Sequence, residues 1–141
     1  MNIKFFYDQI KYRIHKTAEI KEFVGKVITE ENKTPGDLLF IFTDDEIVRD
    51  INRKFLEHDY NTDVISFDYS SGEIVNGEIY ISIDSVKRNA LKYRVKISEE
   101  LLRVIIHGVL HLCGYNDENK NDRGAMFERQ ENQLKEFRKE N

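Results

Sequence analysis

The chain is organised around residues Ile105–Asp117, which read I-I-H-G-V-L-H-L-C-G-Y-N-D. His107 and His111 are separated by one helical turn, so a helix places both imidazoles on the same face. Gly114 then ends the predicted helix, because glycine readily adopts the left-handed conformation that follows a helix. The stretch therefore predicts a helix that presents two imidazoles to one point in space.

The same stretch predicts a metal centre. Two neutral imidazoles on one helix face can bind a single Zn²⁺, and a short turn after Gly114 can bring the carboxylate of Asp117 to the same ion. Three protein ligands with a fourth position open to water are typical of catalytic zinc. H-x-x-x-H alone also fits unrelated core or surface histidines. However, the apolar residues that surround the pair predict a buried helix, where histidines need partners such as a metal.

The stretch His107–Asp117, H-G-V-L-H-L-C-G-Y-N-D, resembles H-G-x-L-H-L-x-G-Y-D-H, the signature of the YbeY family of bacterial metal-dependent endoribonucleases that mature ribosomal RNA. Upstream, Ile51-Asn52 and Thr62–Phe67 (T-D-V-I-S-F) are similar to the family's L-N and T-D-V-L-S-F. Gly77–Ser82 (G-E-I-Y-I-S) is similar to its G-D-I-x-I-S. The resemblance implies an α/β fold with the histidine helix at its centre and an RNA substrate.

The ligand positions depart from the family pattern in two places. Asp117 stands where the family usually has a third histidine, and Asn116 stands where it has an aspartate. A carboxylate still binds zinc but is a harder ligand, so another divalent metal is an alternative to one Zn²⁺. Glu118 and Asp122 are alternatives to Asp117 as the third ligand.

Candidate substrate-binding residues come from the resemblance and from clusters of charge. Leu56 stands where the family has an arginine assigned to the substrate phosphate, so nearby basic residues would take that role. Asp63 and Ser66 enter by resemblance as active-site neighbours, and turn formation or a strand hydrogen bond is the structural alternative. A basic cluster before the metal helix predicts either a phosphate-binding ridge beside the ion or a solvated helix face. The substrate candidates are Arg53, His58, Asp63, Ser66, Lys87 and Arg88, and the cluster is Lys87, Arg88, Lys92, Arg94 and Lys96.

The predicted function is a single-strand-specific, metal-dependent endoribonuclease of ribosomal RNA processing, with ribosomal proteins as candidate further partners. Zn²⁺ lowers the pKa of bound water to about 7 and polarises a phosphoryl oxygen, which together suit phosphodiester cleavage. Exposed backbone in single-stranded RNA can enter such a site. One alternative is a noncatalytic ribosome-assembly factor whose metal stabilises the fold. The other is a zinc peptidase, which Gly108 disfavours because zincins need glutamate after the first histidine. No general acid or base is assigned.

Composition limits the other possibilities. The chain has 141 residues, which predicts one domain over residues 1–141, and 40% apolar with 34% charged residues predicts a globular protein. A net charge of −4 argues against a broad nonspecific nucleic-acid binder. The sequence shows neither a membrane span nor a signal peptide, and the single cysteine, Cys113, excludes an internal disulfide. These features predict a cytoplasmic protein, with Cys113 as a buried small hydrophobe.

The predicted fold class is α/β (α+β), with a mixed sheet of about four strands and about five helices around the histidine helix. Thr17, Thr43 and Ser98 are predicted helix caps, Thr43 as part of a capping box with Glu46. Phe55 and Phe127 are predicted on apolar helix faces. Predicted strands are 2–7, 38–42, 64–67 and 78–83. Predicted helices run from Thr17 to about Asn32, from the Thr43 cap through Phe55, from the end of the fourth strand to about Tyr93, from the Ser98 cap to Gly114, and from about Asp122 through Phe137. Residues 33–36 are a predicted turn, 57–62 are irregular, and 69–77 are a loop or hairpin connection.

Overall fold

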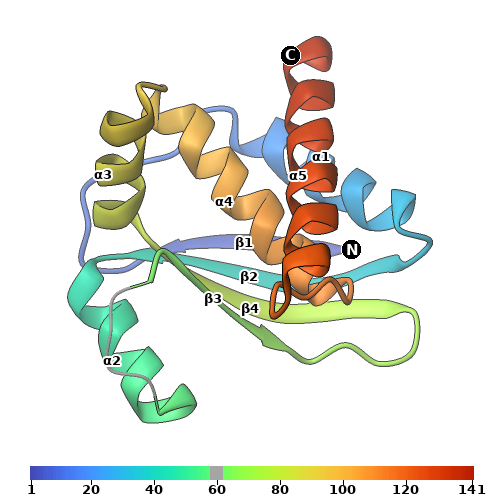
Figure 1. The fold of residues 1–141 in the computed structure, drawn as a ribbon, viewed down its shortest axis with the longest axis horizontal. Coiled ribbons are helices and arrows are strands. Elements are labelled where there is room, and N and C mark those ends of the chain that lie inside the picture. The colour runs from blue at the N-terminus through green and yellow to red at the C-terminus, as the bar shows by residue number, and fades with distance from the viewer. Residues whose placement is uncertain (58–61) are drawn as a thin grey trace.

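The computed structural model describes residues 1–57 and 62–141, and within them it confirms the predicted mixed four-stranded sheet and five helices (Figure 1). His58, a predicted substrate residue, lies outside the described residues. In chain order the elements are β1 (Asn2–Tyr7), α1 (Thr17–Glu30), β2 (Thr34–Thr43), α2 (Asp45–Leu56), β3 (Val64–Asp68), β4 (Ile74–Ser82), α3 (Ile83–Tyr93), α4 (Ile97–Leu112) and α5 (Lys120–Glu140).

The sheet has the strand order β1-β2-β4-β3, so β1 and β3 are its edges. β1 and β2 pair in parallel, as do β2 and β4, whereas β3 pairs antiparallel with β4. α4 packs on β3 and β4 and contacts both α1 and α5, and Figure 1 shows it lying between α3 and α5 above the strands. α2 lies below the strands in this view and contacts α3 as well as β3 and β4. The histidine helix is therefore central, as predicted.

α4 approaches the sheet closely at Gly108. A Cβ atom at this position would lie 3.0 Å from Cγ2 of Ile79 and 3.3 Å from Oγ of Ser66. Larger side chains would push the helix away from β3 and β4, so a small residue here holds the second half of α4 against the sheet. The buried core residues on both sides of this contact include Phe40, Phe42, Ile79, Ile81, Ile105, Ile106 and Leu110.

The capping box predicted at Thr43 and Glu46 is wrong by one residue. Asp44 is the N-cap of α2, and its carboxylate accepts a hydrogen bond of 2.9 Å from the backbone N–H of Ile47. Thr43 is the last residue of β2, where pairing with β4 keeps it in the sheet. Its hydroxyl is buried and is the one side-chain polar atom without a hydrogen-bond partner among the buried atoms of the described residues.

Two other predicted caps are also wrong. α4 begins before Ser98, with Lys96 as its N-cap, and no side chain caps it. α1 begins at Thr17 itself, after Lys16 in a left-handed conformation. The Thr17 hydroxyl instead donates a hydrogen bond to the backbone carbonyl of Ile14. Both helices are buried on their apolar faces, so packing rather than a polar cap fixes where they begin.

Two predicted loops are partly strand. β2 begins at Thr34, within the predicted turn, because Thr34 and Pro35 pair with Ile74 and Val75. For the same reason β4 begins at Ile74, inside the predicted loop 69–77. A register shift between Pro35 and Leu38 accommodates the proline, which has no N–H to donate.

Two phenylalanines predicted on apolar faces are exposed. Phe55 of α2 and Phe127 of α5 keep most of their side chains in contact with solvent. Phe55 still packs edge-on against Phe67 of β3. No helix among the described residues is both long and apolar enough to cross a lipid bilayer.

Candidate metal centre

His107, His111 and Asp117 form a group of three potential metal ligands. Their ligand atoms all lie within 4.8 Å of one another. The Nε2 atoms of the two histidines are 3.1 Å apart, and Oδ2 of Asp117 lies 3.8 Å from Nε2 of His107 and 3.5 Å from Nε2 of His111. Bonds of about 2.0 Å in a tetrahedral zinc site place ligand nitrogens roughly 3.3 Å apart, so these spacings suit one such ion.

Both histidines use their second ring nitrogen to bind a carbonyl oxygen. Nδ1 of His107 lies 2.7 Å from Oε1 of Gln130, and Nδ1 of His111 lies 3.1 Å from the backbone carbonyl of Tyr115. A carbonyl oxygen only accepts, so each Nδ1 carries the proton and each Nε2 presents a lone pair. Two lone pairs and a carboxylate that converge on one point repel each other unless a cation lies among them. The donor set therefore fits a metal ion.

The turn after α4 brings the carboxylate to the histidines. Gly114 has a φ of +105°, which a residue with a Cβ rarely adopts, and the N–H of Tyr115 donates to the carbonyl of Leu110. Arg123 of α5 then donates from Nη1 to the backbone carbonyls of Asp117 and Glu118, both at 3.3 Å. These contacts fix the backbone of the loop that carries Asp117.

Burial also favours the metal-binding form of His111. Burial, together with the neighbouring His107, lowers the pKa of His111, although Asp117 acts to raise it. The neutral imidazole is the form that binds metals. Among the described residues the group includes neither Glu118 nor Asp122, the alternative third ligands. The Asp122 carboxylate accepts a hydrogen bond of 2.7 Å from Asn119 instead.

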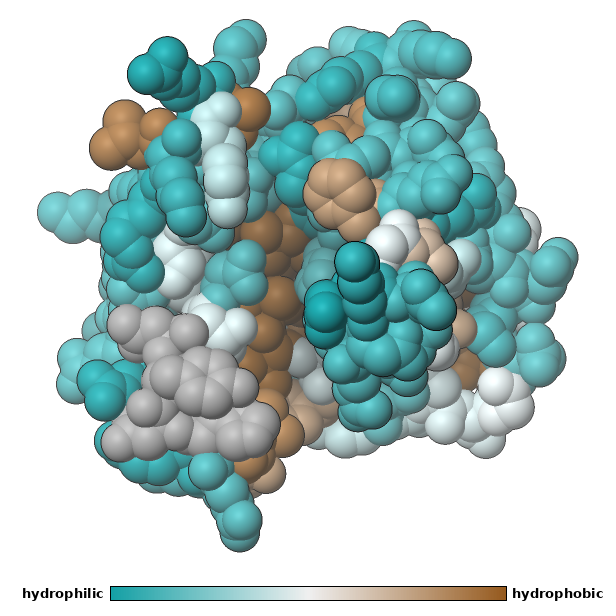
Figure 2. Space-filling view, in the orientation of Figure 1, coloured by the Kyte–Doolittle hydropathy of each residue, from teal (hydrophilic) through white to brown (hydrophobic). Residues whose placement is uncertain are grey.

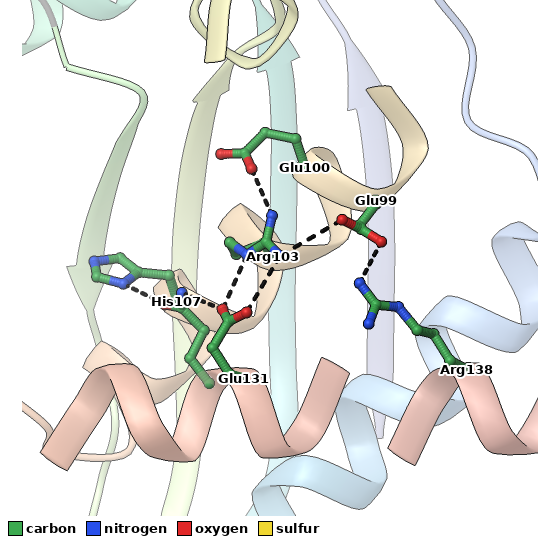
Figure 3. A network of polar contacts seen from close by, with 7 residues as sticks. Glu99, Glu100, Arg103, His107, Glu131 and Arg138 are labelled. Atoms are coloured by element: carbon green, nitrogen blue, oxygen red, sulfur yellow. Dashed lines mark hydrogen bonds and ion pairs between the residues drawn. The ribbon is translucent and has the colours of Figure 1, made fainter. Parts of the chain in front are cut away.

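A chain of polar contacts supports His107 from behind (Figure 3). Gln130, which binds His107, donates from Nε2 to Glu131, and Glu131 is held by Arg103 of α4 at 2.9 Å. Arg103 also binds the buried Glu100 at 2.7 Å. Burial raises the pKa of Glu100, but hydrogen bonding from Arg103 opposes this shift. The network joins α4 to α5 and thereby fixes the amide that orients the histidine.

A pocket of about 390 Å³ opens beside His111. Its lining combines apolar side chains with a few polar groups: Asn52, Leu56, Thr62, Val64, Ile65, Ser66, Asp68, His111 and Leu112. In Figure 2 a band of hydrophobic residues runs down the middle of this face, with hydrophilic surface on both sides. The candidate ligand His111 thus borders a partly apolar cavity, an arrangement typical of a small-molecule or substrate site.

The structure places the predicted substrate residues of α2 and β3 unequally. Ser66 lines the pocket, and its hydroxyl donates to the backbone carbonyl of Gly108 at 3.4 Å. The backbone carbonyl of Asp63 accepts from the N–H of Ser82, which fixes the start of β3. Arg53 is exposed and forms an ion pair with Asp50 on its own helix. Of these three residues only Ser66 lines the pocket.

The basic cluster of residues 87–96 does not form one surface beside the histidines. Arg88 forms an ion pair of 2.6 Å with Asp45, and Lys87 lies over the ring of Tyr12. Arg94 and Lys96 line a different pocket at the N-terminal end of α4. Lys96 precedes His107 by roughly 16 Å along the helix axis, at about 1.5 Å per residue.

Two residues that support the centre were not found from the sequence. Gln130 interrupts the apolar face of α5 between Met126 and Leu134, which are both buried. A glutamine in a stripe of buried residues needs a partner, and that was the available signal. Arg123 carried no comparable signal, because it lies in a highly charged stretch.

The fold and the site together define a class of α+β proteins with two histidines and a carboxylate at the end of a helix that packs on a mixed sheet. Within that class, the family model for "Endoribonuclease YbeY" matches residues 4–138. The chain belongs to this family, as its motifs suggested.

Relatives and a solved structure agree with this assignment. A protein of Flavobacterium psychrophilum named "Endoribonuclease YbeY" is 45% identical over 135 residues, which cover 96% of each chain. A protein of the same name from Parabacteroides distasonis is 38% identical and covers 95% of this chain and 94% of its own. A solution structure from Thermotoga maritima is similar with a TM-score of 0.63 and 28% identity, and covers 98% of this chain and 90% of its own.

Proposed function

We propose that this chain is a zinc-dependent endoribonuclease that cleaves single-stranded segments of ribosomal RNA precursors in the cytoplasm, with ribosomal proteins as further partners. The observation that carries the proposal is a cluster of three metal ligands beside a pocket, in a chain whose relatives are named endoribonucleases. Two imidazole nitrogens and one carboxylate with an open side match catalytic zinc. Asp117 is the harder ligand of the three, so manganese or magnesium is the competing metal.

His107, His111 and Asp117 would hold the ion. When bound there, a divalent ion supplies Lewis acidity to the phosphodiester and to water. The chain's own residues do the rest of the work. Gln130 and the carbonyl of Tyr115 keep both histidines in the metal-binding tautomer, and the pocket beside His111 receives a nucleoside next to the bond that is cut.

The candidate substrate contacts differ in where they stand relative to the pocket beside His111. Ser66 is favoured because it lines the pocket beside His111. Asp63 directly precedes the same strand, and we propose it as a neighbour of the active site. Arg53 stands on α2, three residues before the pocket residue Leu56, and we propose that it contacts a phosphate together with His58. Lys87 and Arg88 of α3 do not line this pocket, so they would contact nucleotides that lie away from the cleaved bond. Arg88 is in addition paired with Asp45.

Packing around Gly108 favours a nuclease over a peptidase. The glutamate of zinc peptidases would stand at this position, directly after the first histidine. A Cβ atom here would lie 3.0 Å from Ile79 and 3.3 Å from Ser66, so a longer side chain has no space. The helix therefore offers no place for the peptidase general base.

The test combines metal analysis with RNA cleavage. Elemental analysis of the purified protein should find about one zinc per chain, and a chelator should stop cleavage of single-stranded RNA that zinc then restores. His111→Ala should abolish both tight metal binding and cleavage, whereas His15→Ala, at an exposed histidine, should change neither. Nuclease activity that persists in His111→Ala would show that it came from elsewhere. A protein that holds zinc but never cleaves RNA would instead be a noncatalytic assembly factor.

A further inference from the structure

Phe127 is a large apolar residue that the fold leaves in water. Its side chain is 60% exposed, although Met126 and Leu134 on the same helix are buried at 1%. The predicted apolar face of α5 included this phenylalanine, but the hydrophobic core does not. Single exposed apolar residues are common, so the exposure of Phe127 gains meaning only from its position beside the candidate site.

Phe127 stands on the face of α5 that borders the metal centre. At about 100° per residue, Arg123, Phe127 and Gln130 lie within roughly 60° of one another around the helix. Arg123 binds the carbonyl of Asp117, and Gln130 binds His107. Phe127 lies between these two contacts along the helix, so it is flanked on both sides by residues that touch the ligand set.

The two histidines are contacted from different elements. His111 lines the pocket formed with α2 and β3, whereas His107 is bound from α5 by Gln130. A phosphodiester at the metal centre would therefore adjoin the pocket through His111 and α5, the helix that carries Phe127, through His107. The two nucleosides that flank the cut bond would then extend toward the pocket and toward α5.

The charge around the site favours a nonionic contact. The chain carries a net charge of −4, and Glu118 and Asp122 follow Asp117 closely, alongside Lys120 and Arg123. Acidic side chains thus offset the attraction of these basic side chains for phosphate. Stacking of a base on an aromatic ring needs no charge, and bases of single-stranded RNA are free to stack on protein rings.

We propose that Phe127 is a stacking platform for an RNA base next to the cleaved phosphodiester. The proposal rests on the proposed function and assigns a substrate-binding residue to the same site. Base–aromatic stacking predicts that Phe127→Ala weakens binding of single-stranded RNA roughly 5- to 150-fold. Because the contact is not ionic, the loss should be about the same at low and at high salt.

Binding is measured on chelated protein, which separates it from turnover. The probe is a short single-stranded RNA that carries 2-aminopurine at one position, moved through the oligonucleotide, since stacking quenches its fluorescence. Wild-type protein should quench one position strongly, Phe127→Trp should keep the quenching, and Phe127→Ala and Phe127→Leu should lose it. In the zinc-loaded protein the alanine variant should raise KM and leave the zinc content unchanged.

Tyr93→Ala is the matched control. Tyr93 is an aromatic residue of similar exposure, 56%, at the end of α3, beside the opposite end of α4 from the histidines. Its replacement should leave RNA binding unchanged. Full binding by Phe127→Ala, or by Phe127→Leu, would overturn the proposal, the second because apolar bulk alone would then suffice. Failure of the wild type to bind or cleave any single-stranded RNA would instead remove the proposed function, and this platform with it.

Discussion

Replacement of Gln130 by leucine tests whether the orientation of His107 depends on α5. Gln130 is only 6% exposed, and its Oε1 lies 2.7 Å from Nδ1 of His107. Leucine keeps a similar volume but removes this acceptor. His107 can then rotate or place its proton on Nε2, the atom that faces Asp117 and His111.

The expected loss follows from the one contact removed. Residues that orient a metal-binding histidine typically contribute 10- to 100-fold to metal affinity. That range corresponds to about 1.4–2.8 kcal/mol, close to the cost of leaving a buried donor without its hydrogen bond. The carboxylate of Glu131, which follows Gln130 in the chain, is already bound by Arg103 and is not expected to take over as the acceptor for His107. We expect Gln130→Leu to bind zinc at least 10-fold more weakly than the wild type.

The assay is competition for zinc against a chromophoric chelator, and Gln133→Leu is the control. Gln133 lies on the same helix, is 2% exposed and donates a hydrogen bond of 2.7 Å to Glu30 of α1 rather than to a histidine. Both variants should lose similar stability in the metal-free form. Zinc affinity within twofold of the wild type for Gln130→Leu, or an equal loss in both variants, would refute a directed role for Gln130.

Three further predictions concern other parts of the chain. Asp117→His should retain or tighten zinc binding, because imidazole is a softer ligand, and loss of zinc in the same competition assay would remove Asp117 from the ligand set. Burial acts to raise the pKa of Asp45, but hydrogen bonds from Arg88, Ser82 and Ser85 outweigh it and lower the pKa. The ionised carboxylate therefore stabilises the fold above the ordinary pKa of aspartate, and this stability is lost as the pH falls through the lowered pKa of Asp45. Asp45→Asn should lower the free energy of unfolding, measured in urea, by about 1–3 kcal/mol at pH 7 and by little in strong acid. Burial raises the pKa of Cys113 to about 11, so iodoacetamide should alkylate this thiol much more slowly in the native protein than in urea at pH 8, and equal rates would contradict its burial.

The sequence predicted the elements that local pattern determines. α4 has apolar residues nearly all round, and Gly114 adopts the positive φ that a helix end requires, so both the helix and its end could be predicted. The spacing of His107 and His111 depends only on helical geometry, which explains why their proximity follows from sequence. The mixed sheet with helices packed on it also follows from strands and helices that alternate through most of the chain.

The predictions from sequence were wrong where contacts between residues far apart in the chain determine the bounds of an element. β2 extends back to Thr34 because Ile74 pairs with it, and no residue near Thr34 signals that partner. Thr43 and Asp44 are both acceptable caps by residue type, and pairing of Thr43 with Ser82 in the sheet decides between them. The basic residues 87–96 looked like one cluster, but a helix, a turn and the start of α4 separate them in space.

The C-terminal helix shows how a site can depend on a segment that looks unrelated to it. α5 is highly charged, and its sequence alone suggests a solvated helix packed by a few apolar residues. In the fold it crosses α4 in the opposite sense, since Arg138 meets Glu99, Glu131 meets Arg103 and Gln130 meets His107. Arg123 extends this series to the loop of Asp117. His107 and Asp117, two of the three candidate ligands, thus have direct contacts from α5, so displacement of this helix should disable the proposed centre while leaving the H-x-x-x-H helix buried and folded.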